Sequence, residues 1–288
     1  MKAYLNIVQN VLTNGVVKKN RTGVDAITLA GCMFEHDMSE GFPLLTTKTV
    51  PFRLVASELE FFIKGITDKN WLREQNNHIW DEWCSPAVVP YGHDTATKAK
   101  MAEERELGPI YGWQWRNFGA DYYNHSSEAG GDGVDQLKNL VNKLKTNPED
   151  RRMIVSAWNP KDIPSMALPP CHYGFQVTVI NGKLNLLWNQ RSVDTALGLP
   201  FNIASYGLLL HLLAREADLA EGRLIGFLAD THVYVNHVDN LKVQLEREPL
   251  KLPSITTKGP NSIFDWEYEN SVIGNYQHHP KLSFEIAV

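Results

Sequence analysis

The chain has 288 residues, 43% of them hydrophobic, and a formal net charge of −5. That length and apolar content suffice for a full hydrophobic core. The negative charge excludes an overall basic field of the kind that holds nucleic acid, so no nucleic-acid partner is expected. The three cysteines form no disulfide framework and lack metal-ligand spacing, which predicts a reducing, cytoplasmic location and no metal. No apolar run approaches the roughly 20 residues of a membrane span, so no membrane association is expected.

Apolar periodicity and turn signals predict a mixture of helices and strands along the chain. Helices are expected at 2–14, 51–65, 95–105, 134–145 and 203–215, with another beyond residue 234. Strands are expected at 27–34, 44–47, 153–158, 173–180, 184–188 and 223–229, with further short strands in 249–288. Residues 120–133 read as a flexible loop. The chain shows no repeat and no clear linker, which predicts one α+β domain over residues 1–288.

Residues 164–202 hold the densest group of chemically reactive side chains. Pro169 and Pro170 fix an extended backbone just before Cys171, which places the thiol at the start of a strand, near a rim. Asn181-Gly182 lies between two apolar runs and predicts a β-hairpin, because both positions tolerate a positive φ. The returning strand is expected to bring four polar residues into the neighbourhood of the thiol: Gln190, Arg191, Ser192 and Asp194.

Each of these residues has an ordinary structural explanation when taken alone. A single cysteine is most often a small buried apolar residue. Arg191 and Ser192 fit a solvated strand end, and Asp194 fits a turn. Together with His172 they indicate a site for an anion. A positive charge close to Cys171 would favour the thiolate, which is the nucleophilic form.

Further basic residues are candidate phosphate ligands. Arg21 lies in a basic loop, for which a solvated loop is the alternative. Arg151 and Arg152 lead into a predicted strand, and guanidinium geometry matches phosphate bidentately. Adjacent strand residues face opposite ways, so one molecule's site is expected to use only one of them. That leaves room for a contribution across a dimer interface.

Two polar residues lie where apolar or capping residues are more usual. The helical neighbours of Glu58, at positions 54, 55, 61 and 62, are all apolar. Glu58 therefore either reaches solvent at the edge of the apolar stripe or is a buried acid with a raised pKa that relays protons. Asn202 precedes a predicted helix, where an N-cap is the favoured interpretation by frequency.

These residues belong to a longer series of motifs by which the chain resembles the thymidylate synthase family, pyrimidine-nucleotide hydroxymethylases included. The matching segments are 21–23, 58, 78–83, 107–112, 151–152, 156–160, 168–172, 190–192, 197–202 and 230–234. The resemblance covers nearly the whole chain. It implies a three-layer α/β sandwich with a mixed sheet, a homodimer formed through that sheet, and insertions at about 84–106 and 120–133.

The resemblance implies reductive methylation of dUMP to dTMP, with 5,10-methylenetetrahydrofolate as the donor of one carbon and of hydride. Cys171 would add to carbon 6 of uracil and make carbon 5 nucleophilic, which splits one difficult step into easier ones. Tyr111, or a water that it holds, would remove the carbon 5 proton. Glu58 would organise water near uracil oxygen 4, with His172 in the same network. Asn202 would read the uracil edge.

The other residues form two binding sets that the resemblance implies. The dUMP set contains Arg21, Gln190, Arg191, Ser192, Asp194, Asn202, His232 and Tyr234, with Arg151 and Arg152 donated by a second subunit. The folate set contains Ile79, Trp80, Trp83, Leu168, Asp194, Leu197, Gly198, Phe201 and Val288, the last as a carboxyl-terminal lid. Arg191 and Asp194 are also expected to take part in catalysis.

The chain departs from the family pattern mainly near the expected folate. Thr195-Ala196 stands where a bulkier pair is usual, and Thr49, Asn189 and Ala229 also differ. The alternative is therefore a dUMP 5-hydroxymethylase, in which water quenches the methylene intermediate and tetrahydrofolate is released. The smaller Ala196 favours that alternative, whereas shielding by Trp80 and Val288 favours hydride transfer.

Two other possibilities carry less weight. A cytosine-reading enzyme would more naturally place a carboxylate where Asn202 stands, which favours uracil. A non-catalytic nucleotide- or RNA-binding homologue needs neither Cys171, Glu58 nor Tyr111 to bind a phosphate and a base, so their presence favours an enzyme.

Overall fold

The computed structural model describes residues 1–20, 23–127 and 132–286. The chain divides into two compact units. Unit 1 contains residues 1–52, 179–258 and 270–288, and unit 2 contains residues 53–178 and 259–269. The expected single domain stays a prediction.

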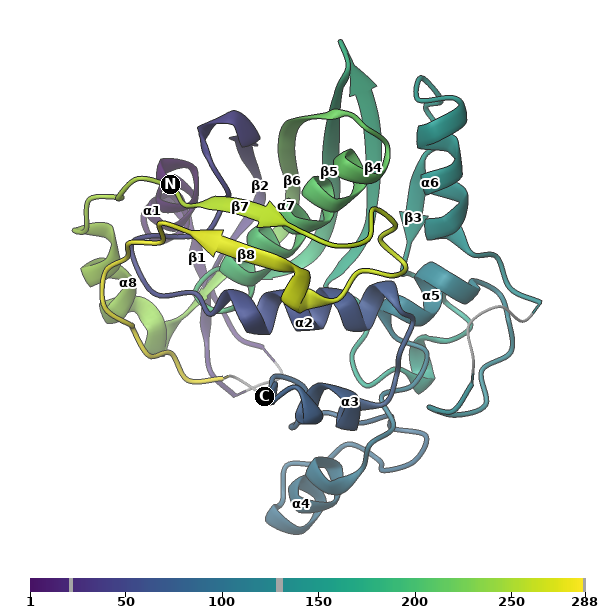
Figure 1. Ribbon diagram of the computed structural model, residues 1–288. Helices are drawn as coiled ribbons and strands as arrows, with labels where there is room; N and C mark the ends of the chain where they lie inside the picture. Colours follow the sequence, from purple (N-terminus) through teal and green to yellow (C-terminus); the bar gives the residue numbers. More distant parts are fainter. Residues whose placement is uncertain (21–22, 128–131, 287–288) are drawn as a thin grey trace. The chain divides into compact units, whose positions relative to one another are not determined.

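Unit 1 combines long strands with one long buried helix (Figure 1). Its strands are β1 (Val16–Lys18), β2 (Ala26–Asp37), β5 (Lys183–Asp194), β6 (Ala220–Tyr234), β7 (Ser254–Thr257) and β8 (Ser271–Gly274). Its helices are α1 (Lys2–Asn14), α7 (Gly198–Glu216) and α8 (Val238–Leu245), with short 3₁₀ turns η1 (Met38–Glu40) and η3 (Val235–His237). The expected helix at 2–14 is therefore confirmed, whereas α7 begins five residues before its predicted start of 203.

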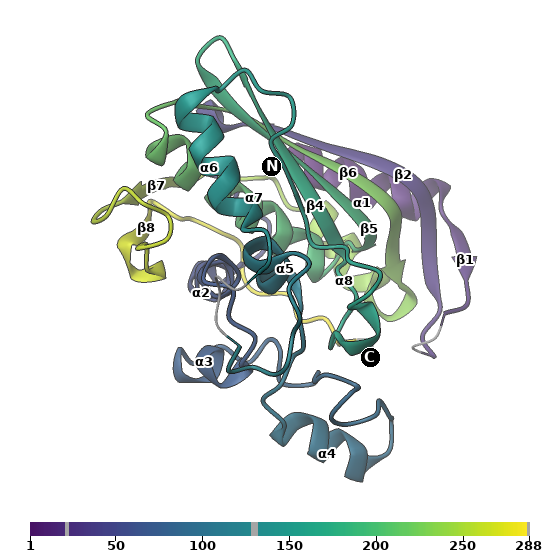
Figure 2. The ribbon, with the colours of Figure 1, turned by 90° about the vertical axis from the view of Figure 1, so that its right-hand side faces the viewer.

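The strands of unit 1 pair in both directions, and Figures 1 and 2 show β1, β2, β6 and β5 side by side. β2 runs antiparallel to β6, with Cys32 opposite Leu228. β5 runs parallel to β6, with Gln190 opposite the same Leu228. Within unit 1 the strand order is β1-β2-β6-β5. A mixed sheet with helices confirms the α+β class.

The hairpin turn forms where the sequence places it. Asn181 has φ of 51° and Gly182 has φ of 72°, the two positive values that a tight hairpin turn requires. The second strand continues through Asp194, six residues beyond the predicted end at 188, so that Gln190, Arg191 and Ser192 all lie within β5.

α7 packs against β5 and β6 through a buried aromatic stack. Trp188 of β5 stacks on Tyr206 of α7, with 5.3 Å between the ring centroids and 10° between the planes. The indole Nε1 of Trp188 donates to Oε1 of Gln190 over 3.1 Å. The core of unit 1 therefore orients a polar residue of the predicted binding set.

Unit 2 is mostly helical. Its helices are α2 (Phe52–Ile63, from Arg53 on), α3 (Lys69–Glu74), α4 (Thr95–Glu103), α5 (Tyr111–Asn117) and α6 (Gln136–Thr146), with η2 (Ile163–Ser165) and η4 (Tyr268–Asn270, to residue 269). Its strands are β3 (Ile154–Ser156) and β4 (His172–Ile180, to Thr178), which pair antiparallel. The helices expected at 51–65, 95–105 and 134–145 are confirmed, with ends that differ from the expected ones by no more than two residues.

The close approach of α5 to α2 sets the position of Tyr111. A Cβ atom on Gly112 would lie 2.4 Å from the carbonyl oxygen of Phe62, so only glycine permits this approach. The ring of Phe62 consequently stacks on the ring of Tyr111, with 4.8 Å between centroids. Phe62 also meets Trp115 edge-on at 5.9 Å.

Two segments of irregular structure bear on the sequence expectations. Residues 44–47 form no strand; Thr46 Oγ1 instead accepts a bond from Leu250 N at 2.9 Å and donates to Leu250 O at 3.3 Å. Hydrogen bonds from a side chain to the backbone of Leu250 thus replace the backbone hydrogen bonds of the expected strand. The loop expected at 120–133 is irregular from 120 to 127, and residues 128–131 lie outside the described part.

Candidate active site

Cys171 stands directly before β4, as the double proline predicts, and is half-buried. Its backbone N–H donates to the phenolic oxygen of Tyr111 over 2.8 Å. Tyr111 is the first residue of α5 and is buried against Phe62. The tyrosine oxygen is therefore held at the backbone of the candidate nucleophile.

Glu58 lies on α2 and is half-buried as a whole residue. The indole Nε1 of Trp80 donates to its Oε1 over 2.8 Å. Burial raises the pKa of Glu58 to about 7, and the Trp80 bond acts in the opposite direction. The arrangement favours the buried-acid interpretation over a side chain that reaches freely into solvent, and Glu58 can exchange a proton near neutral pH.

One aromatic cluster joins Glu58 to Cys171 within unit 2. The Trp80 ring meets Tyr111 at 6.1 Å and Phe62 at 6.5 Å between centroids. The His172 ring lies 4.5 Å from that of Tyr111. Burial lowers the pKa of His172 to about 3, so its imidazole is neutral at physiological pH.

Asn202 and Gln190 form a polar pair within unit 1. Gln190 Nε2 donates to Oδ1 of Asn202 over 2.9 Å and to the carbonyl of Ser192 over 3.1 Å. The expectation that Asn202 caps a helix is wrong, because it lies inside α7, which begins at Gly198. The start of α7 is instead held by Asp194, whose Oδ1 accepts from the backbone N–H groups of Ala196 (2.9 Å) and Leu197 (3.2 Å).

Lys48 is a residue of this region that sequence reasoning missed. Its Nζ donates to the carbonyl of Ala196 over 2.5 Å and lies 4.7 Å from the centre of the Phe284 ring. Burial lowers the pKa of Lys48 to about 8, and the negative charge of Asp194 opposes that shift. A lysine in the otherwise apolar and threonine-rich stretch 44–50 was the available signal.

The predicted ribose and phosphate ligands of unit 1 lie on strands. His232 and Tyr234 are on β6, with 5.2 Å between their ring centroids. The Nδ1 of His232 lies 3.2 Å from the carbonyl oxygen of Asp230 and 3.2 Å from its Oδ1. Arg191 and Ser192 are half-buried on β5.

The arginine pair of unit 2 lies in a turn, and both residues are exposed. The expectation that they are strand residues facing opposite ways is therefore wrong, since β3 begins only at Ile154. Arg152 Nε pairs with Oδ1 of Asp150 over 3.0 Å, and the Arg152 side chain keeps 82% of its surface exposed. Exposed guanidinium groups are available to a phosphate or to another molecule.

The remaining folate candidates are placed within their own units. Ile79, Trp83 and Leu168 are half-buried in unit 2, and the Trp83 ring meets Trp80 at 6.2 Å. Leu197, Gly198 and Phe201 are half-buried at the start of α7. Arg21 and Val288 lie outside the described residues, so their predicted roles stay predictions.

Over residues 1–20, 23–127 and 132–286, the structure shows no group of three or more His, Cys, Asp or Glu side chains able to hold a metal ion. Within the same described ranges, no helix is both long enough and apolar enough to cross a lipid bilayer.

Comparison with known proteins agrees with the motifs and the fold. The chain is 43% identical over 285 residues to the bifunctional dihydrofolate reductase-thymidylate synthase of Paramecium tetraurelia, an alignment that covers 99% of this chain and 61% of that protein. The chain therefore spans about three fifths of the length of this relative. The family model described as thymidylate synthase matches residues 2–288. This chain belongs to the thymidylate synthase family.

Proposed function

We propose that this protein converts dUMP to dTMP, with 5,10-methylenetetrahydrofolate as co-substrate. The observation that carries the proposal is the 2.8 Å bond from Cys171 N to the Tyr111 oxygen, with Glu58 and Trp80 joined to the same aromatic cluster. A nucleotide-binding protein without catalysis requires none of these groups. Family membership and the relative's name support the same activity.

The chemistry follows from the side chains of unit 2. The thiolate sulfur of Cys171 adds to carbon 6 of uracil, and the electrons of the carbon 5–carbon 6 double bond make carbon 5 the nucleophile. The bond from sulfur to carbon 6 breaks again when the hydride completes the methyl group, which frees dTMP and the thiolate. The co-substrate supplies one carbon and, later, a hydride. Tyr111, which already accepts from Cys171 N, positions the base that removes the carbon 5 proton. Glu58, with a pKa of about 7, exchanges protons with water near uracil oxygen 4.

Recognition of the base rests on Asn202. Its Oδ1 accepts from Gln190 Nε2 at 2.9 Å, and Gln190 is in turn held by the Trp188 indole at 3.1 Å. This chain of bonds fixes the amide in one orientation, which suits a base edge that offers both an acceptor and a donor. Uracil offers both groups, through oxygen 4 and N3–H.

Formation of a methyl group is preferred to formation of a hydroxymethyl group. Ala196, the small residue that favours access of water, is fully buried with 0% of its surface exposed. Its carbonyl is bonded to Lys48, and the adjacent Thr195 Oγ1 donates to His232 O over 2.6 Å. A buried, hydrogen-bonded pair supports a site that excludes water, as hydride transfer requires.

We also propose a homodimer that forms through the sheet of unit 1. Met33 of β2 lies opposite Phe227 of β6, and these two side chains keep 55% and 44% of their surface exposed. Ile225 and Leu187 are opposite one another and share this face by the period-2 alternation of strands. Exposed apolar side chains on one sheet face are typical of an interface. Phe227→Glu should yield a monomer in light scattering, whereas an unchanged mass would contradict the proposed interface.

The cysteines support a cytoplasmic location. Cys32, Cys84 and Cys171 are all free thiols in the structure. Proteins of reducing compartments keep such thiols, whereas oxidising compartments favour disulfides.

The deciding experiment incubates the protein with dUMP and methylenetetrahydrofolate, separates the nucleotide products by mass, and follows dihydrofolate absorbance. Gain of a methyl group together with dihydrofolate is expected. Gain of a hydroxymethyl group without dihydrofolate would instead identify the hydroxymethylase, and no new nucleotide would contradict both enzymes.

A further inference from the structure

Lys69, the first residue of α3, is a buried cation that contacts backbone carbonyls from two segments. Its side chain has 0% of its surface exposed. Its Nζ donates to Asp81 O over 3.0 Å, to Trp83 O over 2.9 Å and to Met101 O over 2.7 Å. An ammonium group has three N–H donors, so these three carbonyls use all of them.

The three carbonyls connect the 84–106 insertion to the loop that carries Trp80 and Trp83. Asp81 and Trp83 belong to that loop, and Met101 lies in the last turn of α4, inside the insertion. Carbonyls in the last turn of a helix lack intrahelical partners and attract cations. The Nζ of Lys69 therefore supplies the hydrogen-bond donor that the Met101 carbonyl lacks within α4, and the same Nζ holds the loop through Asp81 and Trp83.

Arg73 makes a second link of the same kind from the same helix. Its Nε donates to Oδ1 of Asp81 over 2.7 Å, and its Nη2 donates to Ala102 O. Its Nη1 donates to Oδ1 of Asn70 over 2.9 Å, which orients the guanidinium. Both cations of α3 thus contact both the loop and the end of α4.

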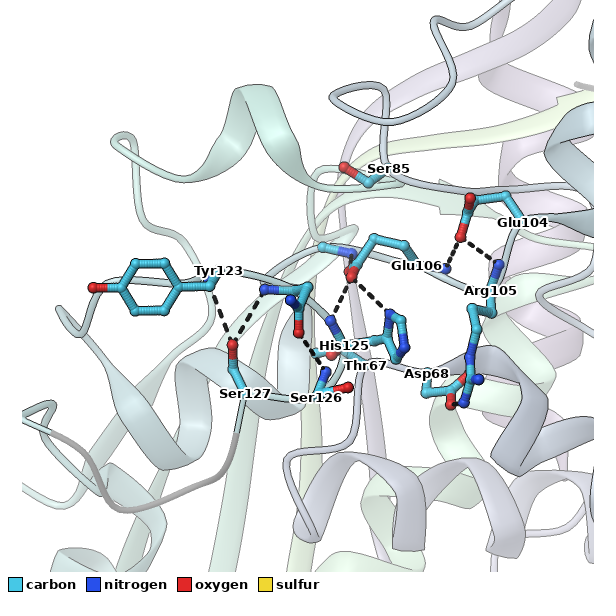
Figure 3. Close-up of polar contacts among 12 residues, drawn as sticks. Thr67, Asp68, Ser85, Glu104, Arg105, Glu106, Tyr123, His125, Ser126 and Ser127 are labelled. Carbon is cyan, nitrogen blue, oxygen red and sulfur yellow. Dashed lines mark hydrogen bonds and ion pairs between the residues drawn. The ribbon is translucent and has the colours of Figure 1, made fainter.

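The insertion is closed at its base by Glu106, shown in Figure 3. The Ser85 N–H donates to Glu106 O over 2.7 Å. The Glu106 carboxylate accepts from the N–H of Gly108 over 2.6 Å, from the Tyr122 hydroxyl and from the N–H of His125. Glu106 therefore joins residues of both expected insertions next to the segment that leads into α5.

The loop held by Lys69 also reaches the chemistry of unit 2. Trp80 lies in it and donates to Glu58 at 2.8 Å, and the Trp83 ring packs on Trp80. We propose that Lys69 is a positioning residue through which the 84–106 insertion holds Trp80 and Trp83, and thereby sets folate affinity and the hydrogen bond to Glu58. This inference rests on the proposed function.

The cost of burying Lys69 argues for such a role. The three partners of its Nζ are carbonyl dipoles, and burial lowers the pKa of Lys69 to about 8, with the charge of Arg73 acting in the same direction. A buried charge held by dipoles demands their accurate placement. Displacing α3, the loop or α4 would leave that charge poorly solvated, so the positions of these three segments are coupled.

The test compares Lys69→Met with Arg73→Gln and with a matched control, Lys100→Met, which removes an exposed lysine from α4. Steady-state kinetics would give KM for each substrate, and calorimetry would give dUMP affinity. Lys69→Met should raise the folate KM about tenfold, because small displacements of positioning groups are costly. The KM rise should be smaller in Arg73→Gln, and Lys100→Met should behave as the unchanged protein. In both α3 variants dUMP affinity should stay within about twofold.

A second readout does not depend on activity. Hydrogen exchange of the Asp81 and Trp83 amides, which donate to His78 O and Trp80 O at 3.2 Å each, should accelerate in both α3 variants and not in Lys100→Met. Unchanged exchange together with unchanged folate KM would overturn the inference. If Lys69→Met does not fold, Arg73→Gln alone decides whether exchange and the folate KM change, because Arg73 is partly exposed and its replacement is better tolerated. Absence of dTMP formation by the unsubstituted protein would refute the proposed function instead, and the exchange result would still test the coupling.

Discussion

Trp80 donates its indole N–H to Oε1 of Glu58, an acid that burial brings to a pKa of about 7. The bond stabilises the carboxylate, whereas burial favours the protonated acid. Glu58 is consequently poised to change protonation state within the physiological range, and its environment predicts how stability depends on pH.

Glu58→Gln should remove part of the pH dependence of stability. The folded protein holds the proton of Glu58 more tightly than the unfolded chain, in which the carboxyl has its ordinary pKa of 4.5. Stability therefore falls as pH rises from 4.5 to about 7, and the full penalty applies above that. Urea unfolding at pH 4 and pH 8 would give the change in the free energy of unfolding between these two pH values. That change should be about 1–3 kcal/mol more favourable to the folded state in the variant than in the unsubstituted protein. The exposed Glu82→Gln serves as the control, and equal pH profiles for all three proteins would contradict the prediction.

The lowered pKa of His172 predicts that stability falls as pH drops, whereas Glu58 makes stability fall as pH rises. Its pKa falls from 6.5 to about 3 in the folded protein, so the unfolded chain binds a proton first as pH drops. The stabilisation is complete above pH 6.5 and is lost progressively toward pH 3. At pH 5 the loss amounts to about 2 kcal/mol, which His172→Gln should abolish. Urea midpoints at pH 5 and pH 7.5 would measure the effect, and an equal acid loss in the variant would show that other groups cause it.

Cys171→Ser should abolish turnover and leave dUMP affinity within about threefold, because a hydroxyl is a far weaker nucleophile of similar shape. Calorimetry measures the affinity, and the mass-resolved product assay measures turnover. Cys32→Ser, on β2, is the matched control and should keep activity. Undiminished turnover in Cys171→Ser would refute covalent catalysis by this residue.

Heterodimers test whether Arg152 serves the neighbouring subunit. Arg152→Ala and Cys171→Ser homodimers should both be inactive or strongly impaired. A mixed dimer holds one site with the intact thiol and the intact arginine of its partner, so activity should return toward one half of the normal value per dimer. Well-formed heterodimers that regain nothing would contradict a shared phosphate site.

Asn202→Asp should weaken turnover of dUMP by about a hundredfold, because a carboxylate cannot donate to uracil oxygen 4. The same variant should bind dCMP better than the unsubstituted protein does, since a carboxylate accepts from the cytosine amino group. Competition assays with both nucleotides measure the change. Retention of full dUMP turnover would show that Asn202 does not read the base.

The sequence by itself determined the elements and the reactive residues that depend on local chemistry. The Asn181-Gly182 turn, the helix at 2–14 and the place of Cys171 before β4 follow from backbone preferences that neighbouring residues impose. The series of motifs from residue 21 to residue 234 also sufficed to identify the family, because their order along the chain is specific.

Only the tertiary structure decided features that depend on residues distant in the chain. Residues 44–47 lack a strand because Thr46 bonds to Leu250, some two hundred positions away. Asn202 is not a cap, because α7 begins before it, where Asp194 Oδ1 accepts from the N–H of Ala196. The side-chain oxygen of Asn202 instead accepts from Gln190 Nε2. The cage of carbonyls around Lys69 joins α3, a loop and α4. No local pattern announces such partners, because backbone carbonyls carry no sequence signature and three-dimensional packing alone brings them together.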